Sequence, residues 1–295
     1  MKKLVVYLQG GLGNQLFQYY AGEFYAKVNN RRLVLNLTKI KSHQTARNFA
    51  LREMQMSGTV EIVNHDHLLQ RLNFLPVLDR LLLRFPILRS IGIRHKGYYI
   101  EKNFDFDYVL RHCTNFDYIT GYFQTYEYFD SCGKAAPQLK EYTGWYEDLL
   151  AVMKRTKPVV IHFRGGDYFR NKDTFGVLHE SYYKNGMELV SSMLGETDVY
   201  IFSDDLMAAQ TSLSFLNPRR VTWVVPPAEA TPFENLLLMS QGSAIIISNS
   251  TFSWWAAKFA ELETIIIAPQ VWSKQNNQPQ KLIPTEWFRV ENSWI

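Results

Sequence analysis

The heptapeptide His162–Tyr168 places a histidine, an arginine and an aspartate directly after the apolar run 158–161. The carboxyl end of a buried strand is where open α/β sheets bind their ligands. Arginine is always charged and its planar fork of donors matches phosphate oxygens, while glycine lets the backbone approach a ligand closely. Arg164 followed by Gly165 therefore predicts a phosphate site, although a surface arginine beside a turn aspartate gives the same short string.

Polar residues follow two further apolar runs in the second half of the chain. Ser203, Asp204 and Asp205 end one of them, and Ser248–Thr251 ends another. An aspartate there can accept hydrogen bonds from the N1–H and amino group of guanine, or it can cap the next helix. The hydroxyl-rich segment can bind an anion at a helix amino terminus or serve only as an N-cap. Together with Arg164, these residues predict a nucleoside diphosphate site at one edge of a sheet.

A glycine-rich turn at Gly10–Gly13 separates an apolar run at 3–8 from a helical pattern at 14–28. A second apolar run follows, which indicates a βαβ opening. The third glycine and the acidic residue of the dinucleotide-binding fingerprint are missing, because Leu16 and Asn36 stand in their places. Two interpretations remain open: the turn faces an anion with its backbone N–H groups, or it is purely structural.

Apolar runs alternate with helical patterns in a regular order from residue 158 onward. Continuous apolar strands separated by helices indicate a parallel sheet covered on both faces. The segment Thr231–Glu234 has the pattern of a capping box with proline at the first helical position. We predict an α/β protein with two Rossmann-like domains, 1–155 and 156–295, joined near 151–157 and facing each other across a cleft. The strands of the second domain are expected at 159–163, 199–202, 221–225, 244–248 and 264–268.

The composition indicates a globular protein with an uneven charge distribution. The chain has 295 residues, of which 46% are hydrophobic. Residues 1–155 hold 21 Lys+Arg and 14 Asp+Glu, a net +7, whereas residues 156–295 hold 11 and 14, a net −3. The basic residues concentrate in the leucine-rich segment 71–102, which is either a solvated helix face or a peripheral contact with an anionic membrane. No nucleic-acid-binding module accompanies the charge, so we expect no nucleic-acid partner.

Neither a signal peptide nor a membrane helix is expected. The apolar run after Lys3 ends at Gln9, too early for the apolar core of a signal peptide. The longest uncharged span, 235–257, contains asparagine, glutamine and serine side chains that would be unsatisfied in lipid. Cys113 and Cys132 are too widely spaced for a metal knuckle. We therefore expect a cytoplasmic protein, with peripheral contact at the inner face of the membrane as an open alternative.

The middle of the chain is less regular and contains two further candidates. Asp105 and Asp107 form the Asp-X-Asp pair that holds a divalent ion in many sugar-nucleotide transferases, but no apolar strand leads into it, so no metal is expected. The segment 119–125 is expected to form a short aromatic strand. Its Gln124 is a candidate for contact with a sugar hydroxyl, and packing of the aromatic side chains explains the rest of the segment.

Ordered motifs along nearly the whole chain resemble those of the bacterial α-1,2-fucosyltransferases, glycosyltransferase family 11. They are Gly10–Gln18, His162–Tyr168, Phe202–Asp205 and Ser248–Trp255, with 121–124 as a further similar segment. The resemblance implies a GT-B fold and inverting, metal-independent transfer of L-fucose from GDP-β-L-fucose, with no cofactor. The implied acceptor is the 2-hydroxyl of a terminal β-galactoside, which a cytoplasmic enzyme would take from a lipid-linked unit of a surface polysaccharide.

The resemblance implies a role for Arg164, and the other candidate roles follow from the positions of the residues. Arg164 is implied to pair with the β-phosphate of the donor, with Asn14 as a second group near the leaving diphosphate. His162 and Asp167 are candidates for the general base, and Gln15 and Gln124 for acceptor contacts. The donor-binding candidates are Gly11, Gly13, Asn14, Arg164, Ser203, Asp204, Asp205, Asn249, Ser250, Thr251 and Phe252.

One position departs from the family pattern. The family usually has two adjacent arginines in the histidine-led motif, and Gly165 stands in place of the second. We expect Gly165 to change the loop conformation more than to abolish catalysis. Three alternatives stay open: transfer of another GDP-sugar, transfer to another hydroxyl, and a non-catalytic protein that binds nucleotide sugars or glycans.

Overall fold

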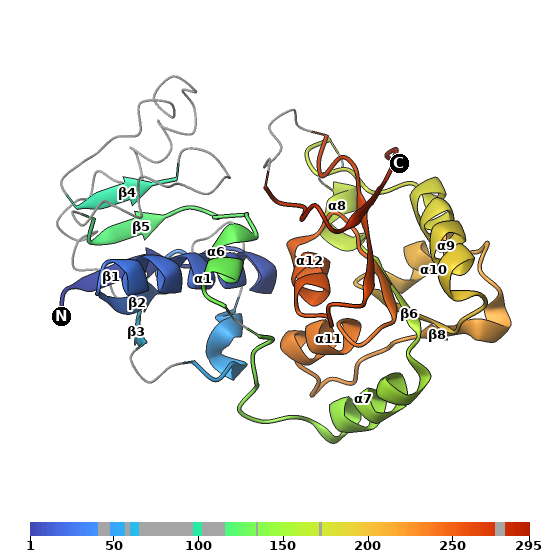
Figure 1. Ribbon diagram of the computed structural model, residues 1–295, viewed down its shortest axis with the longest axis horizontal. Coiled ribbons are helices and arrows are strands. Elements are labelled where there is room, and N and C mark those ends of the chain that lie inside the picture. The colour runs from blue at the N-terminus through green and yellow to red at the C-terminus, as the bar shows by residue number, and fades with distance from the viewer. Residues whose placement is uncertain are drawn as a thin grey trace. The chain divides into compact units, whose positions relative to one another are not determined.

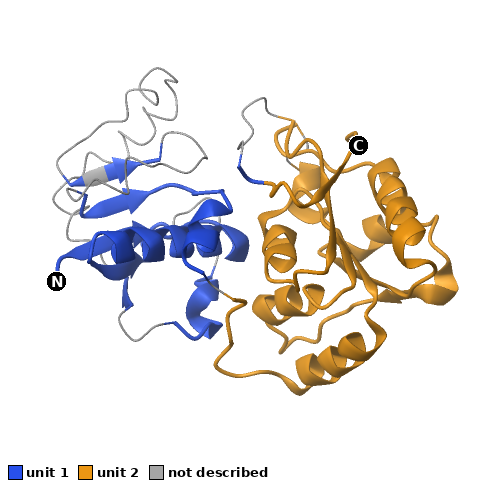
Figure 2. Ribbon diagram, viewed as in Figure 1, with its two compact units in different colours: residues 1–134, 279–282 blue, residues 135–278, 283–295 orange. Residues whose placement is uncertain are grey.

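The computed structural model forms two compact units (Figure 2). They comprise residues Met1–Lys134 with Pro279–Leu282, and Ala135–Gln278 with Ile283–Ile295. The chain therefore passes from one unit to the other three times, and its carboxyl-terminal part contributes to both. The residues that the structure describes are 1–40, 48–56, 60–64, 97–101, 116–133, 135–170, 173–274 and 281–295.

The described part of the first unit contains a five-stranded parallel sheet in the order β3-β2-β1-β5-β4 (Figure 1). Strands β2 and β3 lie on one side of β1, and β4 and β5 lie on the other side. The direction in which strands are added therefore reverses beside β1, and such a switch point is where these sheets bind ligands. The elements are β1 Lys3–Tyr7, α1 Leu12–Val28, β2 Arg32–Asn36, η1 Ala50–Glu53, β3 Glu61–Val63, β4 Tyr98–Ile100, β5 Tyr118–Thr120 and α6 Glu127–Ser131.

The strand predicted for 119–125 is too long. Strand β5 ends at Thr120, and Phe123 has a φ of +53°, which is outside the range of any strand. The aromatic residues after β5 therefore form a turn at the carboxyl edge of the sheet, and Phe123 packs its ring into the core with 1% of its surface exposed.

The described part of the second unit contains a six-stranded parallel sheet in the order β11-β10-β9-β6-β7-β8. If β6 to β11 are numbered 1 to 6 along the chain and the sheet is read from its β8 edge, the order is 3-2-1-4-5-6, which is the Rossmann order. Its switch point lies between β6 and β9. The strands are β6 Val159–Phe163, β7 Val199–Ser203, β8 Val221–Trp223, β9 Ala244–Ile246, β10 Ile265–Pro269 and β11 Phe288–Val290. The first five confirm the predicted strands to within a few residues, whereas β11 was not predicted.

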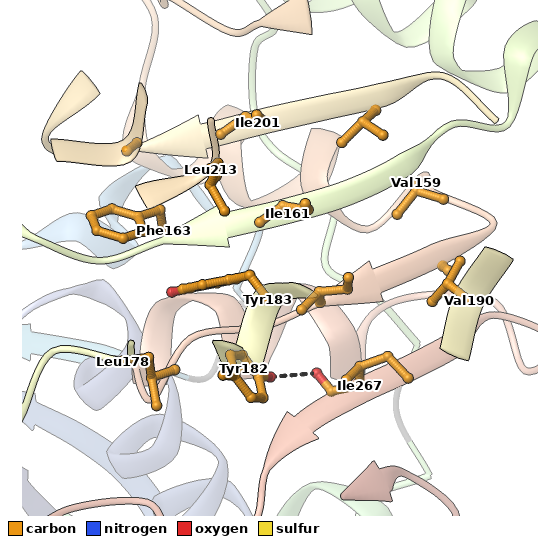
Figure 3. Close-up of a cluster of buried hydrophobic side chains, with 14 of the residues drawn as sticks. Val159, Ile161, Phe163, Leu178, Tyr182, Tyr183, Val190, Ile201, Leu213 and Ile267 are labelled. Carbon is orange, nitrogen blue, oxygen red and sulfur yellow. Dashed lines mark hydrogen bonds between the residues drawn. The ribbon is translucent and has the colours of Figure 1, made fainter. Parts of the chain in front are cut away.

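Helices connect these strands: α7 Gly144–Thr156, α8 Gly166–Arg170, α9 Glu180–Leu194, α10 Leu206–Ser212, η2 Pro218–Arg220, α11 Pro232–Met239 and α12 Thr251–Lys258. Figure 3 shows the core between the sheet and α9, where Ile161 of β6 lies near Tyr182 and Tyr183. The Tyr182 hydroxyl donates to the carbonyl oxygens of Ile247 (2.6 Å) and Ile267 (3.2 Å), so burying this phenol leaves no polar atom unsatisfied. The helix is thereby fixed against β9 and β10.

The boundary between the units lies earlier than the predicted division at 155/156, and the predicted linker 151–157 is mostly the last part of helix α7. The physical reason is the buried carboxylate of Glu234. It accepts from the backbone N–H of Thr231 (2.8 Å), completing the predicted capping box of α11, and from that of Thr143 (2.6 Å), the N-cap of α7. One side chain thus joins the starts of two helices, and α7 packs with the second unit.

This double cap predicts a large effect of one substitution on stability. Glu234→Ala leaves two backbone N–H groups without their acceptor, and we expect the free energy of unfolding to fall by about 3 kcal/mol. Urea titration followed by circular dichroism measures the change. The matched control is Glu188→Ala on the exposed face of α9, expected within about 0.5 kcal/mol of wild type. Equal effects of the two substitutions would contradict the double cap.

Candidate functional site

Arg164 comes directly after β6, at the switch point of the second sheet. Its Nη2 donates to Asp167 Oδ1 (2.5 Å), and its Nη1 pairs with Asp204 Oδ2 (2.8 Å). The guanidinium also lies over the ring of Tyr168, with 5.1 Å from Cζ to the ring centroid. Three neighbours therefore fix this cation, and 21% of its side chain is exposed.

The sequence predicts an arginine directed at a phosphate, and the structure shows the same arginine held by two carboxylates. Its remaining donor, Nε, is buried and has no hydrogen-bond partner among the described residues. An unmet hydrogen bond of a buried charged group costs about 1–3 kcal/mol, so this arrangement leaves Arg164 with binding capacity unused. Two carboxylates face one guanidinium, so an anionic ligand that binds Arg164 must replace at least one of them.

Asp204 and Asp205 have different partners. Besides Arg164, Asp204 accepts from the backbone N–H of Gly165 (2.9 Å). Asp205 is the N-cap of α10, where its Oδ1 accepts from the N–H of Ala208 (3.1 Å). The hydroxyl of Ser203 is engaged within the same turn, with both the N–H and the carbonyl oxygen of Asp205 at 2.9 Å. For Asp205 the capping interpretation is confirmed, while contact of either aspartate with guanine stays a prediction.

Gly165, the position that departs from the family pattern, lies in a confined space. A Cβ atom added there would be 2.9 Å from Cε2 of Phe169, 3.0 Å from Cβ of Asp205 and 3.2 Å from Cε1 of Phe163. Such contacts force neighbouring atoms to move. In this chain the loop after β6 therefore packs closely against the N-cap of α10, and a side chain at position 165 would require Phe169 and Asp205 to shift.

His162 is the last but one residue of β6 and 4% of its surface is exposed. Its Nδ1 shares a hydrogen bond with Ser248 Oγ (2.7 Å), which links β6 to the segment after β9, and its ring lies against Phe252. Burial, and next the charge of Arg164, lower the pKa of His162 to about 3. A neutral, buried imidazole with so low a pKa is a poor proton acceptor at neutral pH, so the geometry favours a structural role over that of general base.

The segment Ser248–Thr251 leads from β9 into α12 at the switch point. Ser250 is the N-cap, and its Oγ accepts from the N–H of Phe252 (3.3 Å). The amide nitrogen of Asn249 donates to the carbonyl oxygens of Phe175 (3.0 Å) and Gly176 (3.2 Å), so this predicted donor-binding side chain anchors a loop. The amino terminus of α12 follows β9, the parallel neighbour of β6, so it lies at the same edge of the sheet as Arg164. Thr251 and Phe252 are partly exposed there.

Tyr168 belongs to this site, although its role was not predicted. Its ring stacks on Phe175 (5.0 Å between centroids), faces the Arg164 guanidinium, and its hydroxyl donates to the carbonyl oxygen of Asn249 (3.1 Å). Burial raises the pKa of Tyr168 to about 12, so the hydroxyl stays a donor. Arg164 lies before the start of α8 at Gly166, so helical spacing does not indicate this contact, and the signal in the sequence is only that both residues belong to the motif His162–Tyr168.

A second group of candidates lies at the switch point of the first sheet. Gly10 turns the chain after β1 with a φ of +78°, and Gly11 is the N-cap of α1. Asn14 lies in the first turn of α1, where its Oδ1 accepts from Nε2 of Gln124 (3.1 Å), the residue that follows β5 by four positions. The structure thus brings Asn14 and Gln124 together. Gly13, the second residue of α1, is buried.

Gln15 is not placed to contact an acceptor, which corrects the prediction. Its side chain has 0% of its surface exposed. The amide nitrogen donates to the carbonyl oxygens of Gly10 (3.0 Å) and Asn48 (2.9 Å), and the amide oxygen accepts from the N–H of Ala50 (3.0 Å). Gln15 therefore holds two backbone segments together, a role that only the tertiary contacts reveal.

Several predicted features lie outside the described residues. These are Asp105, Asp107, Cys113 and most of the basic segment 71–102, of which 98–100 form strand β4. In the part of the chain that the structure covers, no group of three His, Cys, Asp or Glu side chains is placed to hold a metal ion. Nor does any helix of that part combine the length and apolar character needed to cross a bilayer.

Known structures share this architecture. The fucosyltransferase NodZ from Bradyrhizobium superposes with a TM-score of 0.50 at 13% identity, over 88% of this chain and 93% of that one. NodZ α-1,6-fucosyltransferase co-crystallised with GDP gives a TM-score of 0.50 at 12% identity, over 88% of this chain and 92% of that one. Two Rossmann-like parallel sheets of this kind are the GT-B fold, which confirms the predicted fold class, while the cleft between the two domains stays a prediction.

The family follows from the sequence comparison. The model described as glycosyl transferase family 11 matches residues 3–291, and the chain belongs to this family. The O-antigen biosynthesis glycosyltransferase WbnK of Escherichia coli is 27% identical over 308 residues, covering 96% of this chain and 99% of that protein. An α-1,2-colitosyltransferase of Escherichia coli is 25% identical over 301 residues, covering 99% of this chain and all of that protein.

The environment of His162 predicts a dependence of stability on pH. Its folded-state pKa lies below the unfolded value of about 6.5, so the unfolded chain takes up the proton first and stability falls as the pH drops below 6.5. Between pH 7.5 and 4.5 we expect wild type to lose about 3 kcal/mol more than His162→Gln, because glutamine does not titrate in this range. Urea titrations at both pH values measure the difference, and equal losses would show that His162 is not buried in its neutral form.

The confined space at Gly165 predicts that even one methyl group is costly. Gly165→Ala is expected to lower the free energy of unfolding by about 1–3 kcal/mol, the range for overpacking. The control is Gly144→Ala at the first residue of α7, where an added Cβ meets no atom within 4 Å, and which we expect to be neutral or slightly stabilising. Chemical denaturation compares them. Wild-type stability of Gly165→Ala would mean that the loop after β6 is looser than described.

Proposed function

We propose that this family 11 glycosyltransferase transfers L-fucose from GDP-β-L-fucose to the 2-hydroxyl of a terminal β-galactoside, with inversion at the anomeric carbon. The acceptor belongs to a surface polysaccharide of the O-antigen kind. The observation that carries the proposal is the position of Arg164, at the switch point of a Rossmann sheet and beside the amino terminus of α12. The names of the relatives, an O-antigen glycosyltransferase and fucosyl- and colitosyltransferases, support the choice of donor and product.

The chemistry of transfer requires positive potential at the leaving group. The transition state is oxocarbenium-like, and negative charge grows on the departing diphosphate as the bond to the anomeric carbon breaks. Arg164 and the positive end of the α12 dipole supply that potential without a metal ion. For Arg164 to bind the β-phosphate, its guanidinium exchanges one or both carboxylates, Asp167 and Asp204, for phosphate oxygens.

Neither candidate for the general base is available in the arrangement that the structure shows. Asp167 is paired with Arg164, and His162 is buried with a pKa of about 3. Strong stabilisation of the leaving group lowers the demand on a base, because less nucleophilic push is needed from the acceptor oxygen. In this proposal the acceptor hydroxyl loses its proton late and to solvent water, not to His162. Asp167 takes that proton only if it is the carboxylate that the phosphate replaces.

A second candidate donor is a GDP-linked 3,6-dideoxy sugar. The α-1,2-colitosyltransferase covers the whole of this chain at a similar identity to the other relative, and colitose differs from L-fucose by the absence of the 3-hydroxyl. Incubation with GDP-fucose or GDP-colitose and a panel of β-galactosides, followed by linkage analysis of the product, separates the two donors and also other linkages. Binding of a GDP-sugar without release of GDP would favour a non-catalytic binding protein.

Arg164→Ala is expected to lower kcat by about a hundredfold or more, the effect of removing a main stabiliser of transition-state charge. Release of GDP from GDP-fucose in the presence of a β-galactoside measures it. The control is Arg170→Ala, an exposed arginine at the end of α8, the helix that follows Arg164, and we expect a wild-type rate for it. A near-wild-type rate of the folded Arg164→Ala variant would overturn the assignment.

Metal independence is part of the proposal and has its own test. Because the charge stabilisation comes from Arg164 and a helix terminus, transfer should continue at an unchanged rate in excess EDTA. Loss of activity with EDTA, restored by Mn²⁺, would contradict this and would direct attention to Asp105 and Asp107.

A further inference from the structure

Glu101 follows β4 at the carboxyl edge of the first sheet and binds the turn that follows β5. Strands β4 and β5 pair in parallel, with Ile100 opposite Thr120, and the N–H of Glu101 donates to the Thr120 carbonyl oxygen (2.9 Å). The two oxygens of the Glu101 carboxylate accept from two successive backbone N–H groups, those of Tyr122 (2.7 Å) and Phe123 (3.0 Å). A charged acceptor for adjacent amides makes strong hydrogen bonds, so this side chain determines the path of the turn.

The turn adopts a conformation that its sequence does not favour. Phe123 has a φ of +53°, in the left-handed region that side chains other than glycine rarely occupy. Its ring is fixed among Tyr25 and Tyr128, whose hydroxyls are 2.5 Å apart. Gly121 is required because an added Cβ would be 2.4 Å from Cβ of Glu101. The strained residue is thus held on one side by Glu101 and on the other by the aromatic core.

The conformation of Phe123 determines where the side chain of the next residue, Gln124, points. The carboxamide nitrogen of Gln124 donates to Asn14 Oδ1 (3.1 Å). The turn is also joined to the start of α1 by Gln18, whose side chain donates to the Gly121 carbonyl oxygen (3.1 Å) and accepts from the N–H of Gln9 (2.9 Å). The turn after β5 and the turn after β1 therefore form one connected edge at the switch point.

We propose that Glu101 is a positioning residue for the acceptor: it sets the pair of carboxamides Gln124 and Asn14, and this pair binds hydroxyl groups of the acceptor glycan. The inference rests on the proposed function for the reaction itself. Carboxamides offer neutral donors and acceptors, which match sugar hydroxyls, whereas the cation and helix terminus suited to a diphosphate lie in the second unit. Both amides are partly exposed, so they are accessible to a ligand.

The test separates acceptor binding from donor binding. With GDP-fucose and a β-galactoside, Glu101→Gln is expected to raise the KM for the galactoside about tenfold and to leave the KM for GDP-fucose within about twofold of wild type, since a carboxamide can accept only one of the two N–H groups well. Gln124→Ala keeps the hydrogen bonds of Glu101, and it should likewise raise the KM for the galactoside and leave the KM for GDP-fucose nearly unchanged. The double variant should be no worse than either single variant, because both remove the same contact.

Two controls keep the outcome decisive. Glu61→Gln changes a surface carboxylate of the same unit that pairs with Lys3 (2.9 Å), and it should leave both KM values unchanged. Amide hydrogen exchange needs no substrate: Glu101→Gln should accelerate exchange in 121–124 and leave the segment around Gln9 protected. If Glu101→Gln does not fold, Gln124→Ala still tests the acceptor contact.

Three results would overturn the inference. They are a wild-type acceptor KM for Gln124→Ala, an equal rise of both KM values in Glu101→Gln, and unchanged exchange of the turn in Glu101→Gln. Absence of any transfer by wild type from GDP-fucose is a different result. It would refute the proposed function, while hydrogen exchange would still decide whether Glu101 holds the turn.

Discussion

The ion pairs of Arg164 are the interaction on which the functional edge of the second unit depends. Strand β6 is buried over its whole length and pairs with both β7 and β9, so the residue that follows it emerges at the switch point. There Asp167 from α8 and Asp204 from the end of β7 hold the guanidinium. One cation thereby ties together segments that follow two neighbouring strands, and Asp204 extends the tie to the backbone of Gly165. The same contacts that order the loop also occupy the groups that a diphosphate needs.

This arrangement makes ligand binding an exchange of partners. A diphosphate that approaches Arg164 competes with two carboxylates that are already in place, and the amino terminus of α12 favours its negative charge. The other neighbours of Arg164 are neutral: Tyr168 lies against the guanidinium with its ring face, and His162 is held in its neutral form. These neutral groups do not compete with an anionic ligand for the guanidinium.

Much of this could be predicted from the sequence, because strand ends in parallel sheets are marked by local patterns. The run that ends at His162 and the capping box at Thr231 are local features, and the structure has both where they were expected. Contacts between residues distant in sequence could not be predicted. The pairing of Asp204 with Arg164, the burial of Gln15 between two loops and the left-handed Phe123 held by Glu101 depend on which strands become neighbours. Local propensity carries no information about that choice.

The central claim is that Arg164 exchanges its carboxylates for the β-phosphate of a GDP-sugar. Its most direct test is calorimetric titration of wild type and Arg164→Ala with GDP and with GMP, which lacks the β-phosphate. Charge-assisted hydrogen bonds to that group predict that wild type binds GDP at least about tenfold more tightly than GMP, and that the ratio falls to about one in Arg164→Ala. The same preference for GDP in both proteins would contradict the claim, because another group would then hold the β-phosphate.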